Sequence, residues 1–266
     1  MGVNKKTLRK KLTAVYNKYH SANYLHRDPL VCVRRFKEPA QIEVVGFLAA
    51  CLAYGRVERI IYAINEIVSL ADGNLLSFIG GTTYAQKKKK LAHFKHRFTG
   101  GRDIALLLES VKQALDDYGS MEQFFTACSR ATPCSMKSAM TNFSLRLREY
   151  AKRRQSPLQR SFKYLIPSPS SGSACKRLNM YFRWVIRKQD GIDFGLWKSI
   201  SPSVLIIPLD VHIARVAKQF LLCSRKSVDW KMAEEITATL REFDRDDPVK
   251  YDFSLCRYGM EMGRSL

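Results

Sequence analysis

Apolar residues recur at helical spacing along almost the whole chain, and this periodicity limits the fold more than any other feature. In Lys5–His20 they fall at Leu8, Leu12 and Val15, with lysines between them. Such a stripe is typical of an amphipathic helix with one buried face. No stretch alternates convincingly between apolar and polar residues over six positions, so no half-buried strand is predicted. The sequence therefore predicts an all-α fold.

The expected helices are separated by glycine, proline and serine residues, which break helical patterns. Pro248 suits the first turn of a last helix. The predicted helices are Lys5–His20, Ile42–Ala53, Val57–Leu70, Ile104–Tyr118, Met121–Cys128, Met136–Arg153, Lys176–Lys188, Asp210–Leu222, Asp229–Phe243 and one that starts near Pro248.

The charge balance favours a polyanionic partner. Lys and Arg number 45 against 24 Asp and Glu, for a formal net charge of +21. A chain this basic attracts nucleic acid by long-range electrostatics. The alternative is a generally basic or ribosome-associated protein. The basic residues concentrate in Gln123–Gln189, which holds fourteen Lys or Arg and one acid, whereas Asp229–Asp252 holds eight acids. One face of the protein is therefore expected to be cationic.

The chain has no apolar run long enough to cross a bilayer, and Met1–Lys11 has no apolar signal-peptide core. We therefore expect a cytoplasmic, nucleoid-associated monomer that does not contact membranes. The seven cysteines show no metal-ligand spacing, so free thiols and no metal or other cofactor are expected.

A proline- and serine-rich segment, Pro167–Asn179, ends where a helix is predicted to begin. It reads as a tight turn that opens onto a helix N-terminus, where unpaired backbone N–H groups favour a phosphate. Lys176 lies in the first turn of that helix. An uncharged amine there can act as a nucleophile and form a Schiff base. The alternatives are an ordinary loop with Ser173 as helix cap and a Lys176 that is solvated or contacts phosphate only.

Asp210 follows the apolar run Leu205–Leu209 and stands where another helix is predicted to start. A carboxylate held by backbone N–H groups stays ionised and can stabilise positive charge on a sugar. The alternative is a simple helix cap, a position that Asp favours.

Together these two segments resemble the helix-hairpin-helix DNA glycosylase superfamily (HhH-GPD). The matching stretches are Gly-Ser-Ala-Cys-Lys-Arg-Leu-Asn at 172–179 and Ile-Pro-Leu-Asp-Val-His-Ile-Ala-Arg-Val-Ala at 207–217. The resemblance implies that Lys176 is the catalytic nucleophile and Asp210 the catalytic carboxylate. It also implies DNA contacts by Gly172, Ser173, Ala174, Arg177 and His212.

The chain departs from the superfamily pattern in three respects. Ala174 stands where the hairpin usually has its second glycine. We expect this change to make the hairpin less compact, so that it binds phosphate less closely. Lys176 and Asp210 are 34 residues apart, a separation that looks like the archaeal 8-oxoguanine glycosylase branch. The clustered cysteines of the iron–sulfur branch are absent, so no cluster is expected.

Over nearly its full length the chain is also similar to the domain of unknown function 2400 family. The stretches that carry this similarity include Phe47–Val57, Ser173–Asn179 and Asp247–Phe253. That family is itself glycosylase-like, and membership in it does not establish an activity.

A glycosylase extrudes its target base and fills the gap. The resemblance points to the turn Ala53–Arg56, where Tyr54 would stack in the duplex and Arg56 would contact the orphaned base or a phosphate. The alternative is a helix C-cap at Gly55 with Tyr54 merely packing. Among candidates for base stacking, Trp184, Phe194 and Trp197 read better as core residues.

We therefore expect two helical domains with a cleft between them that Lys176 and Asp210 face. One is a barrel over residues 38–188, which includes the hairpin. The other is formed by residues 1–37 plus 189–266. The predicted function is a base-excision DNA glycosylase/lyase that removes oxidised purine, with 8-oxoguanine as the best guess, from double-stranded DNA. The alternative is a non-catalytic DNA- or RNA-binding helical protein.

Overall fold

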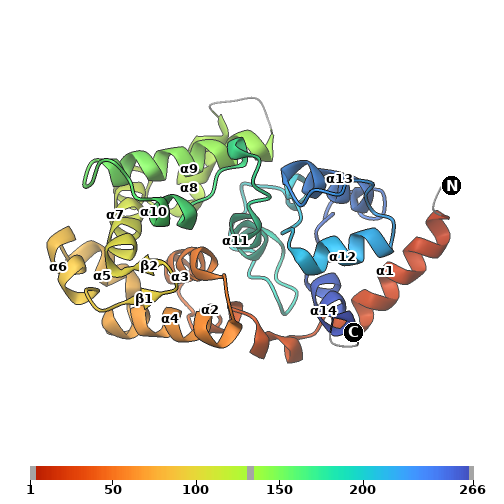
Figure 1. Ribbon diagram of the computed structural model, residues 1–266, viewed down its shortest axis with the longest axis horizontal. Coiled ribbons are helices and arrows are strands. Elements are labelled where there is room, and N and C mark those ends of the chain that lie inside the picture. Colours follow the sequence, from red (N-terminus) through yellow and green to blue (C-terminus); the bar gives the residue numbers. More distant parts are fainter. Residues whose placement is uncertain (1–3, 131–134, 264–266) are drawn as a thin grey trace. The chain divides into compact units, whose positions relative to one another are not determined.

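The computed structural model describes residues 4–130 and 135–263. Nearly all of its regular structure is helical (Figure 1). Within the described ranges the strands are Lys95–His96 (β1) and Thr99–Gly100 (β2), which form one antiparallel pair. The prediction of an all-α fold is confirmed. In the described part of the chain, no helix has the length and apolar character needed to traverse a bilayer.

The chain divides into two compact units. Unit 1 comprises Met1–His26 and Pro169–Leu266, and unit 2 comprises Arg27–Ser168. These boundaries differ from the predicted 38–188 and 1–37 plus 189–266. The hairpin and the helix that starts at Lys176 group with the C-terminal helices because their contacts are made there. Trp230 N–H, for example, donates to the carbonyl of Gly172.

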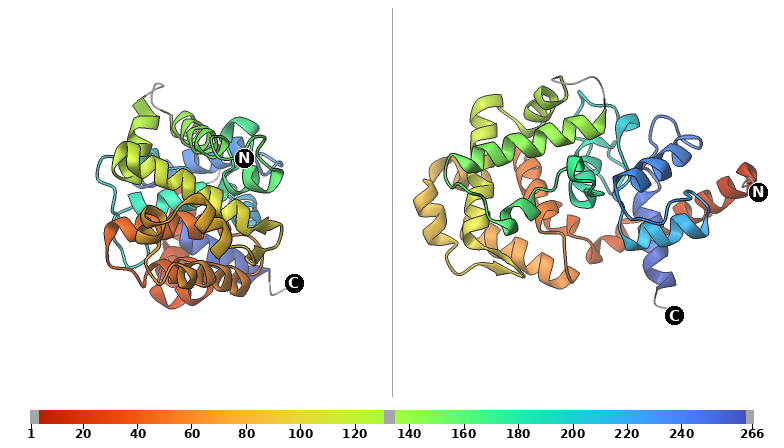
Figure 2. Two further views of the ribbon diagram at one scale, coloured as in Figure 1. Left: turned by 90° about the vertical axis from the view of Figure 1, so that its left-hand side faces the viewer. Right: turned by 45° about the horizontal axis from the view of Figure 1, so that its top comes forward.

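Unit 2 is built around α3, whose residues from Gln41 to Leu52 are all buried. Its aromatic core includes Phe47, Phe124 and Phe143, with ring centroids 5.0–5.7 Å apart for the Phe47–Phe143 and Phe124–Phe143 pairs. Helix α9 packs along α7 and α8 (Figure 2). The helices of this unit are α2 (Leu30–Val33), α3 (Pro39–Leu52), α4 (Val57–Leu70), α5 (Leu75–Gly81), α6 (Tyr84–Lys90), α7 (Gly101–Tyr118), α8 (Met121–Arg130), α9 (Met136–Lys152) and α10 (Arg160–Leu165).

Two short helices of unit 2, α5 and α6, have side-chain caps at their N-termini. Asn74 accepts from the backbone N–H of Ser77 at the start of α5, and Thr83 forms a capping box with Gln86 at the start of α6. Lys87, in the four-lysine run, is fully buried and donates to the carbonyls of Ile79 and Thr82. The four-lysine run is therefore not wholly solvated, because Lys87 is buried.

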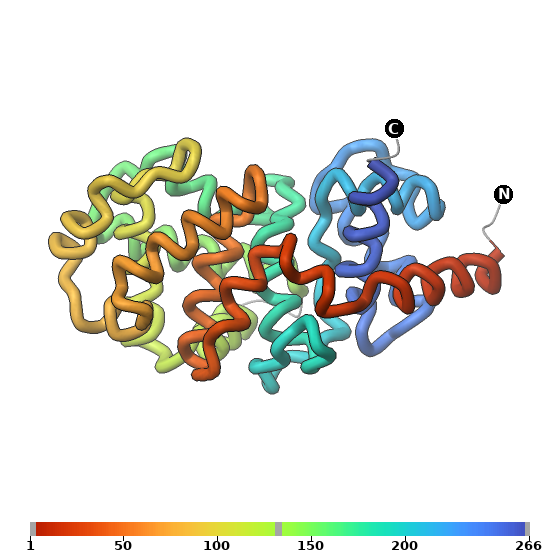
Figure 3. The backbone as a smooth tube through the Cα atoms, turned by 90° about the horizontal axis from the view of Figure 1, so that it is seen from below, coloured from red at the N-terminus to blue at the C-terminus, as the bar shows by residue number. Residues whose placement is uncertain are grey.

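Unit 1 joins the first helix of the chain to the last. The C-terminal end of α1 packs against α14, and α12 packs on the same helix (Figures 1 and 3). The 3₁₀ turn η1 (Ala22–Arg27) follows α1 and runs into unit 2. The remaining elements are α1 (Lys5–Tyr19), η2 (Pro169–Ser171), α11 (Lys176–Ile186), η3 (Pro202–Val204), α12 (Val211–Gln219), α13 (Trp230–Arg241) and α14 (Asp252–Met262).

Most predicted helix boundaries shift by a few residues, and two of the shifts have a local cause. Helix α11 ends at Ile186 because Arg187 has extended backbone dihedrals, and its side chain pairs with carboxylates of the following loop. Helix α14 begins at Asp252, since Pro248–Tyr251 form a turn before it.

Candidate functional site

The hairpin before α11 turns sharply and delivers Lys176 as the first residue of the helix. Gly172 has φ +79° and Cys175 has φ +48°, so the chain passes twice through the left-handed region. Ser173 Oγ accepts from the backbone N–H of Cys175, and Asn179 donates to the carbonyl of Ala174. The residue at the N-cap is Cys175 and not Ser173. These local hydrogen bonds thus fix the backbone position of Lys176, from which its side chain extends.

Asp210 is the N-cap of α12, at the end of a buried extended segment. Ile207 and Leu209 of that segment are buried, and Ile207 N–H donates to Thr237 of α13. Asp210 Oδ1 accepts from the backbone N–H groups of His212 and Ile213, each at 2.9 Å. This is the capping geometry that Asp favours. Because Oδ1 takes both bonds, Oδ2 faces the rest of the site.

The structure brings Lys176 and Asp210 together. Lys176 Nζ lies 3.1 Å from Asp210 Oδ2. The Asp210 side chain is 12% exposed, while that of Lys176 is 37% exposed, so the amine is accessible to a molecule from solvent. Both residues belong to unit 1. Their contact is therefore made inside one unit, which corrects the expectation that they face each other across a cleft between domains.

The environment keeps Asp210 ionised. Burial favours the neutral acid, but the Lys176 charge and the hydrogen bond from Ile213 outweigh it, so the pKa of Asp210 is below its ordinary value. A carboxylate with a lowered pKa is a weak base, and its negative charge persists at neutral pH. The pair is thus suited to stabilise positive charge beside an accessible amine.

Cys256 on α14 completes this cluster. Its Sγ lies 4.0 Å from Asp210 Oδ2, the oxygen that also contacts Lys176. Burial and the Asp210 charge raise the pKa of the Cys256 thiol, so the group is neutral. Gly259 lets α14 approach α12 closely, because a Cβ there would stand 2.8 Å from the carbonyl oxygen of His212. No local pattern in the sequence points to Cys256.

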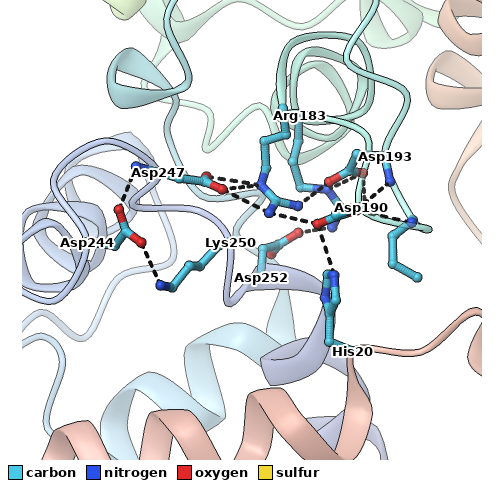
Figure 4. Close-up of polar contacts among 10 residues, drawn as sticks. His20, Arg183, Asp190, Asp193, Asp244, Asp247, Lys250 and Asp252 are labelled. Carbon is cyan, nitrogen blue, oxygen red and sulfur yellow. Dashed lines mark hydrogen bonds and ion pairs between the residues drawn. The ribbon is translucent and has the colours of Figure 1, made fainter.

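A buried ionic network lies beside the site in unit 1 (Figure 4). Arg183 pairs with Asp193 and Asp252, and Arg187 pairs with Asp190, Asp193 and Asp247. Burial raises the pKa of Asp252 to about 6 against the opposing Arg183 charge, and the Asp210 charge contributes to the rise. The network therefore reaches the site electrostatically through Asp252, four residues before Cys256 on α14.

This network corrects one expectation about the basic middle of the chain. Arg177, Arg183 and Arg187 are buried, at 7%, 3% and 1% exposed, and do not add to a cationic surface. Arg183 and Arg187 neutralise buried aspartates, two of which belong to the acidic segment 229–252. Part of the positive charge of the middle segment and part of the negative charge of segment 229–252 thus neutralise each other inside the protein.

The other residues expected to contact DNA around the hairpin differ in exposure. Gly172 is exposed, and a Cβ there would meet nothing within 4 Å. Ser173 and Ala174 are half-buried, as is His212. Arg177 is buried, so its predicted DNA contact is not available at the surface.

Tyr54 and Arg56 lie in unit 2, where the structure places them differently from a projecting wedge. The Tyr54 hydroxyl donates to Thr99 Oγ1 at 2.6 Å, and its ring stacks on Phe98. Tyr54 is thus held by its neighbours in this unit. Arg56 is exposed at the N-cap of α4, and Gly55 between them has φ +99°.

The tryptophans of the predicted core are buried: Trp184 is 1% and Trp197 2% exposed, and Phe194 is half-buried. Six cysteines are free in the described ranges, and Cys134 lies outside them. Among described residues, no group of His, Cys, Asp and Glu is arranged to hold a metal ion.

Comparison with protein-family models gives a match. The model of a family described as protein of unknown function (DUF2400) matches residues 28–261, which include Lys176, Asp210 and Cys256. No curated protein and no solved structure matches the chain.

Proposed function

The chain belongs to the DUF2400 family of proteins of unknown function, and from the site within it we propose a DNA base-excision glycosylase with lyase activity. The observation that carries this proposal is the 3.1 Å contact between the accessible Lys176 amine and the buried Asp210 carboxylate. The hairpin and helix resemblance to the helix-hairpin-helix glycosylases supports it. So does the net charge of +21, which favours a polyanionic substrate.

In the proposed reaction, Lys176 Nζ gives a proton to solvent and attacks C1′ of the damaged nucleotide with its lone pair. The C1′–N bond breaks, and the base leaves with the bonding electron pair and takes up a proton. The nitrogen of the adduct then passes a proton to O4′, the C1′–O4′ bond breaks, and the opened sugar is left as a Schiff base between Nζ and C1′. Removal of a C2′ proton eliminates the 3′-phosphate, which is the lyase step.

Asp210 has two roles in this scheme. Its charge stabilises the positive charge that develops on the sugar as the base departs. It also accepts a hydrogen bond from the attacking amine and orients it. Because the free protein holds the amine and carboxylate as an ion pair, the substrate must separate them before attack. An accessible Lys176 beside a fixed Asp210 allows that separation.

The proposed substrate is double-stranded DNA with an oxidised purine, 8-oxoguanine being the first to test. The lesion must leave the base stack before Nζ can reach C1′. We further propose that the protein acts as a monomer on nucleoid DNA in the cytoplasm and requires no cofactor for this chemistry.

Borohydride trapping tests the proposal directly. Duplexes that carry either 8-oxoguanine or an abasic site are incubated with protein and sodium borohydride, which reduces the Schiff base to a stable covalent adduct. We expect an adduct with the wild type and none with Lys176→Gln. Lys218→Gln, which changes an exposed lysine on α12, is the matched control and should trap normally.

Two outcomes would refute the proposed chemistry. Trapping that survives in Lys176→Gln would show that another amine is the nucleophile. A wild-type protein that binds the duplexes but forms no adduct and cuts neither would leave a non-catalytic nucleic-acid-binding protein.

A further inference from the structure

Unit 2 carries an aromatic cluster that the site in unit 1 does not use. It is formed by Tyr54, Phe98 and Tyr164, and we call it the aromatic platform. The Phe98 ring stacks on Tyr54 at a centroid distance of 5.2 Å and an interplanar angle of 17°. Tyr164 stands edge-on to both, at 4.7 Å from Phe98 and 5.2 Å from Tyr54.

Two of the three rings remain open to solvent. Phe98 is 46% exposed and Tyr164 is 44% exposed. Tyr54 lies beneath them and is fixed by its hydroxyl bond to Thr99. The platform is therefore a preformed surface with an anchored base and two accessible rings, rather than a set of loosely packed surface side chains.

The backbone holds Phe98 at an outer position. The two-residue turn between β1 and β2 consists of Arg97 and Phe98, since His96 pairs with Thr99 across the hairpin. Strand β1 packs against α4 and β2 against α10, so the turn lies between these helices (Figure 1). Arg97 adopts φ +55°, and its side chain passes over Gly55, within 3.2 Å of where a Cβ would stand.

The segments that form the platform are rich in basic residues, and the acids next to them are the exposed Glu58, two residues after Arg56, and the buried Asp103, which accepts from Gly100 and Ser161. The segments themselves, 54–56, 95–100 and 160–164, contain five Lys or Arg and no Asp or Glu. These are Arg56, Lys95, Arg97, Arg160 and Lys163, all exposed. Exposed rings amid cations match a nucleobase to stack and phosphates to neutralise. A hydrophobic partner protein would offer no negative charge to pair with these basic residues.

We propose that the aromatic platform binds an unpaired base of DNA, with Phe98 and Tyr164 stacking on the base and Arg56, Arg97 and Lys163 contacting the adjoining phosphates. The choice of DNA rests on the proposed function. Phe98 thereby takes the stacking role that the glycosylase resemblance assigns to Tyr54, whose hydroxyl and ring are engaged within the unit. Base recognition here needs neither Lys176 nor Asp210.

The test measures binding without catalysis. A short single-stranded oligodeoxynucleotide with a central 2-aminopurine reports stacking by its fluorescence and affinity by anisotropy. Phe98→Ala should weaken binding about tenfold, within the range of base–aromatic stacking, and reduce the fluorescence change. Phe98→Trp should restore both. Tyr62→Ala, which removes a 64% exposed ring on α4 outside the platform, should have no effect.

Three further measurements make the result decisive. Thermal unfolding of Phe98→Ala should match that of the wild type, because the ring is half exposed. Binding of the wild type to this oligonucleotide, which carries no lesion or abasic site, should be retained whether or not the wild type forms a borohydride adduct, so that failure of the lyase chemistry and failure of the platform are told apart. A fully paired duplex without the unpaired base should lose little affinity in Phe98→Ala.

The proposal is overturned if Phe98→Ala binds the single strand as tightly as Tyr62→Ala does. Equal weakening on the fully paired duplex would also overturn it, since the rings would then not act on an unpaired base. A loss of self-association in Phe98→Ala, seen by sedimentation with DNA binding intact, would identify the platform instead as an interface between copies of the chain.

Discussion

Cys256 Sγ lies 4.0 Å from Asp210 Oδ2, so the thiol on α14 is next to the carboxylate that caps α12 in unit 1. Burial and the Asp210 charge both raise the pKa of this thiol. A thiol reacts through its thiolate form. Cys256 therefore lies close to the proposed nucleophile, Lys176, but its neutral thiol does not compete as a second nucleophile.

The first prediction concerns the reactivity of Cys256. Iodoacetamide at pH 8 should leave Cys256 unmodified in the folded protein, because its thiolate is not populated at that pH. Mass spectrometry after digestion measures the labelling. The denatured chain is the control and should label at all seven cysteines. Rapid labelling of Cys256 in the native protein would contradict the neutral thiol.

The second prediction separates the two roles of Asp210. Asparagine caps helices about as well as aspartate, so Asp210→Asn should change the free energy of unfolding by less than about 1 kcal/mol. It removes the charge that faces Lys176, so borohydride trapping should fall about a hundredfold or more. Asp210→Ala should lose both the charge and the cap, at an additional cost of about 1 kcal/mol. Equal trapping by wild type and Asp210→Asn would leave Asp210 as a helix cap only.

The third prediction is a pH dependence of stability from Asp252. Its pKa is about 6 in the folded protein against 3.8 as the ordinary value, so the native state binds a proton that the unfolded state has released. The stability from this proton is fully present below pH 3.8 and is lost as the pH rises through about 6. Denaturant unfolding between pH 4 and 7 should therefore show a downward slope that Asp252→Asn reduces. An unchanged slope would assign the effect to other groups.

The fourth prediction concerns the buried Arg187. Its guanidinium pairs with the buried Asp193 and the half-buried Asp190 and Asp247, so Arg187→Met removes a cation that three carboxylates share. We expect a loss of about 3–5 kcal/mol in the free energy of unfolding. Arg187→Lys should lose less, because it keeps the charge but not the forked geometry.

The matched control for Arg187 is an exposed pair. Lys152→Met breaks the Lys152–Glu149 contact on α9, where the two side chains are 48% and 59% exposed. Such a pair contributes about 0–1 kcal/mol. If both variants lost the same free energy, the buried network would be no more important than a surface ion pair.

The long helices could be predicted from the sequence because a one-sided apolar stripe is a local property. The short helices α5, α6 and α10 were missed, since six or seven residues are too few to show helical periodicity. The β1–β2 hairpin has two residues per strand and no alternation to detect.

At the site too, residues with a local sequence signal could be predicted and residues placed by tertiary packing could not. Lys176 and Asp210 stand out because each follows a recognisable breaker or apolar run at a helix start. Cys256 and Asp252 reach them only through the packing of α14 on α12, which no local pattern encodes. Likewise the burial of Arg183 depends on Asp252, 69 residues away in the chain. Phe98 carries no signal in the sequence because its exposure and its stacking on Tyr54 are both tertiary.

Unit 1 is assembled from both ends of the chain, with unit 2 between them. During translation, α1 leaves the ribosome more than two hundred residues before its packing partner α14 is made. Unit 2 is complete in the nascent chain well before that, and domains generally fold as units during synthesis. The corner that holds Lys176, Asp210 and Cys256 thus forms only after unit 2, so a product truncated before α14 would carry the aromatic platform without the contacts that α14 makes at Asp210.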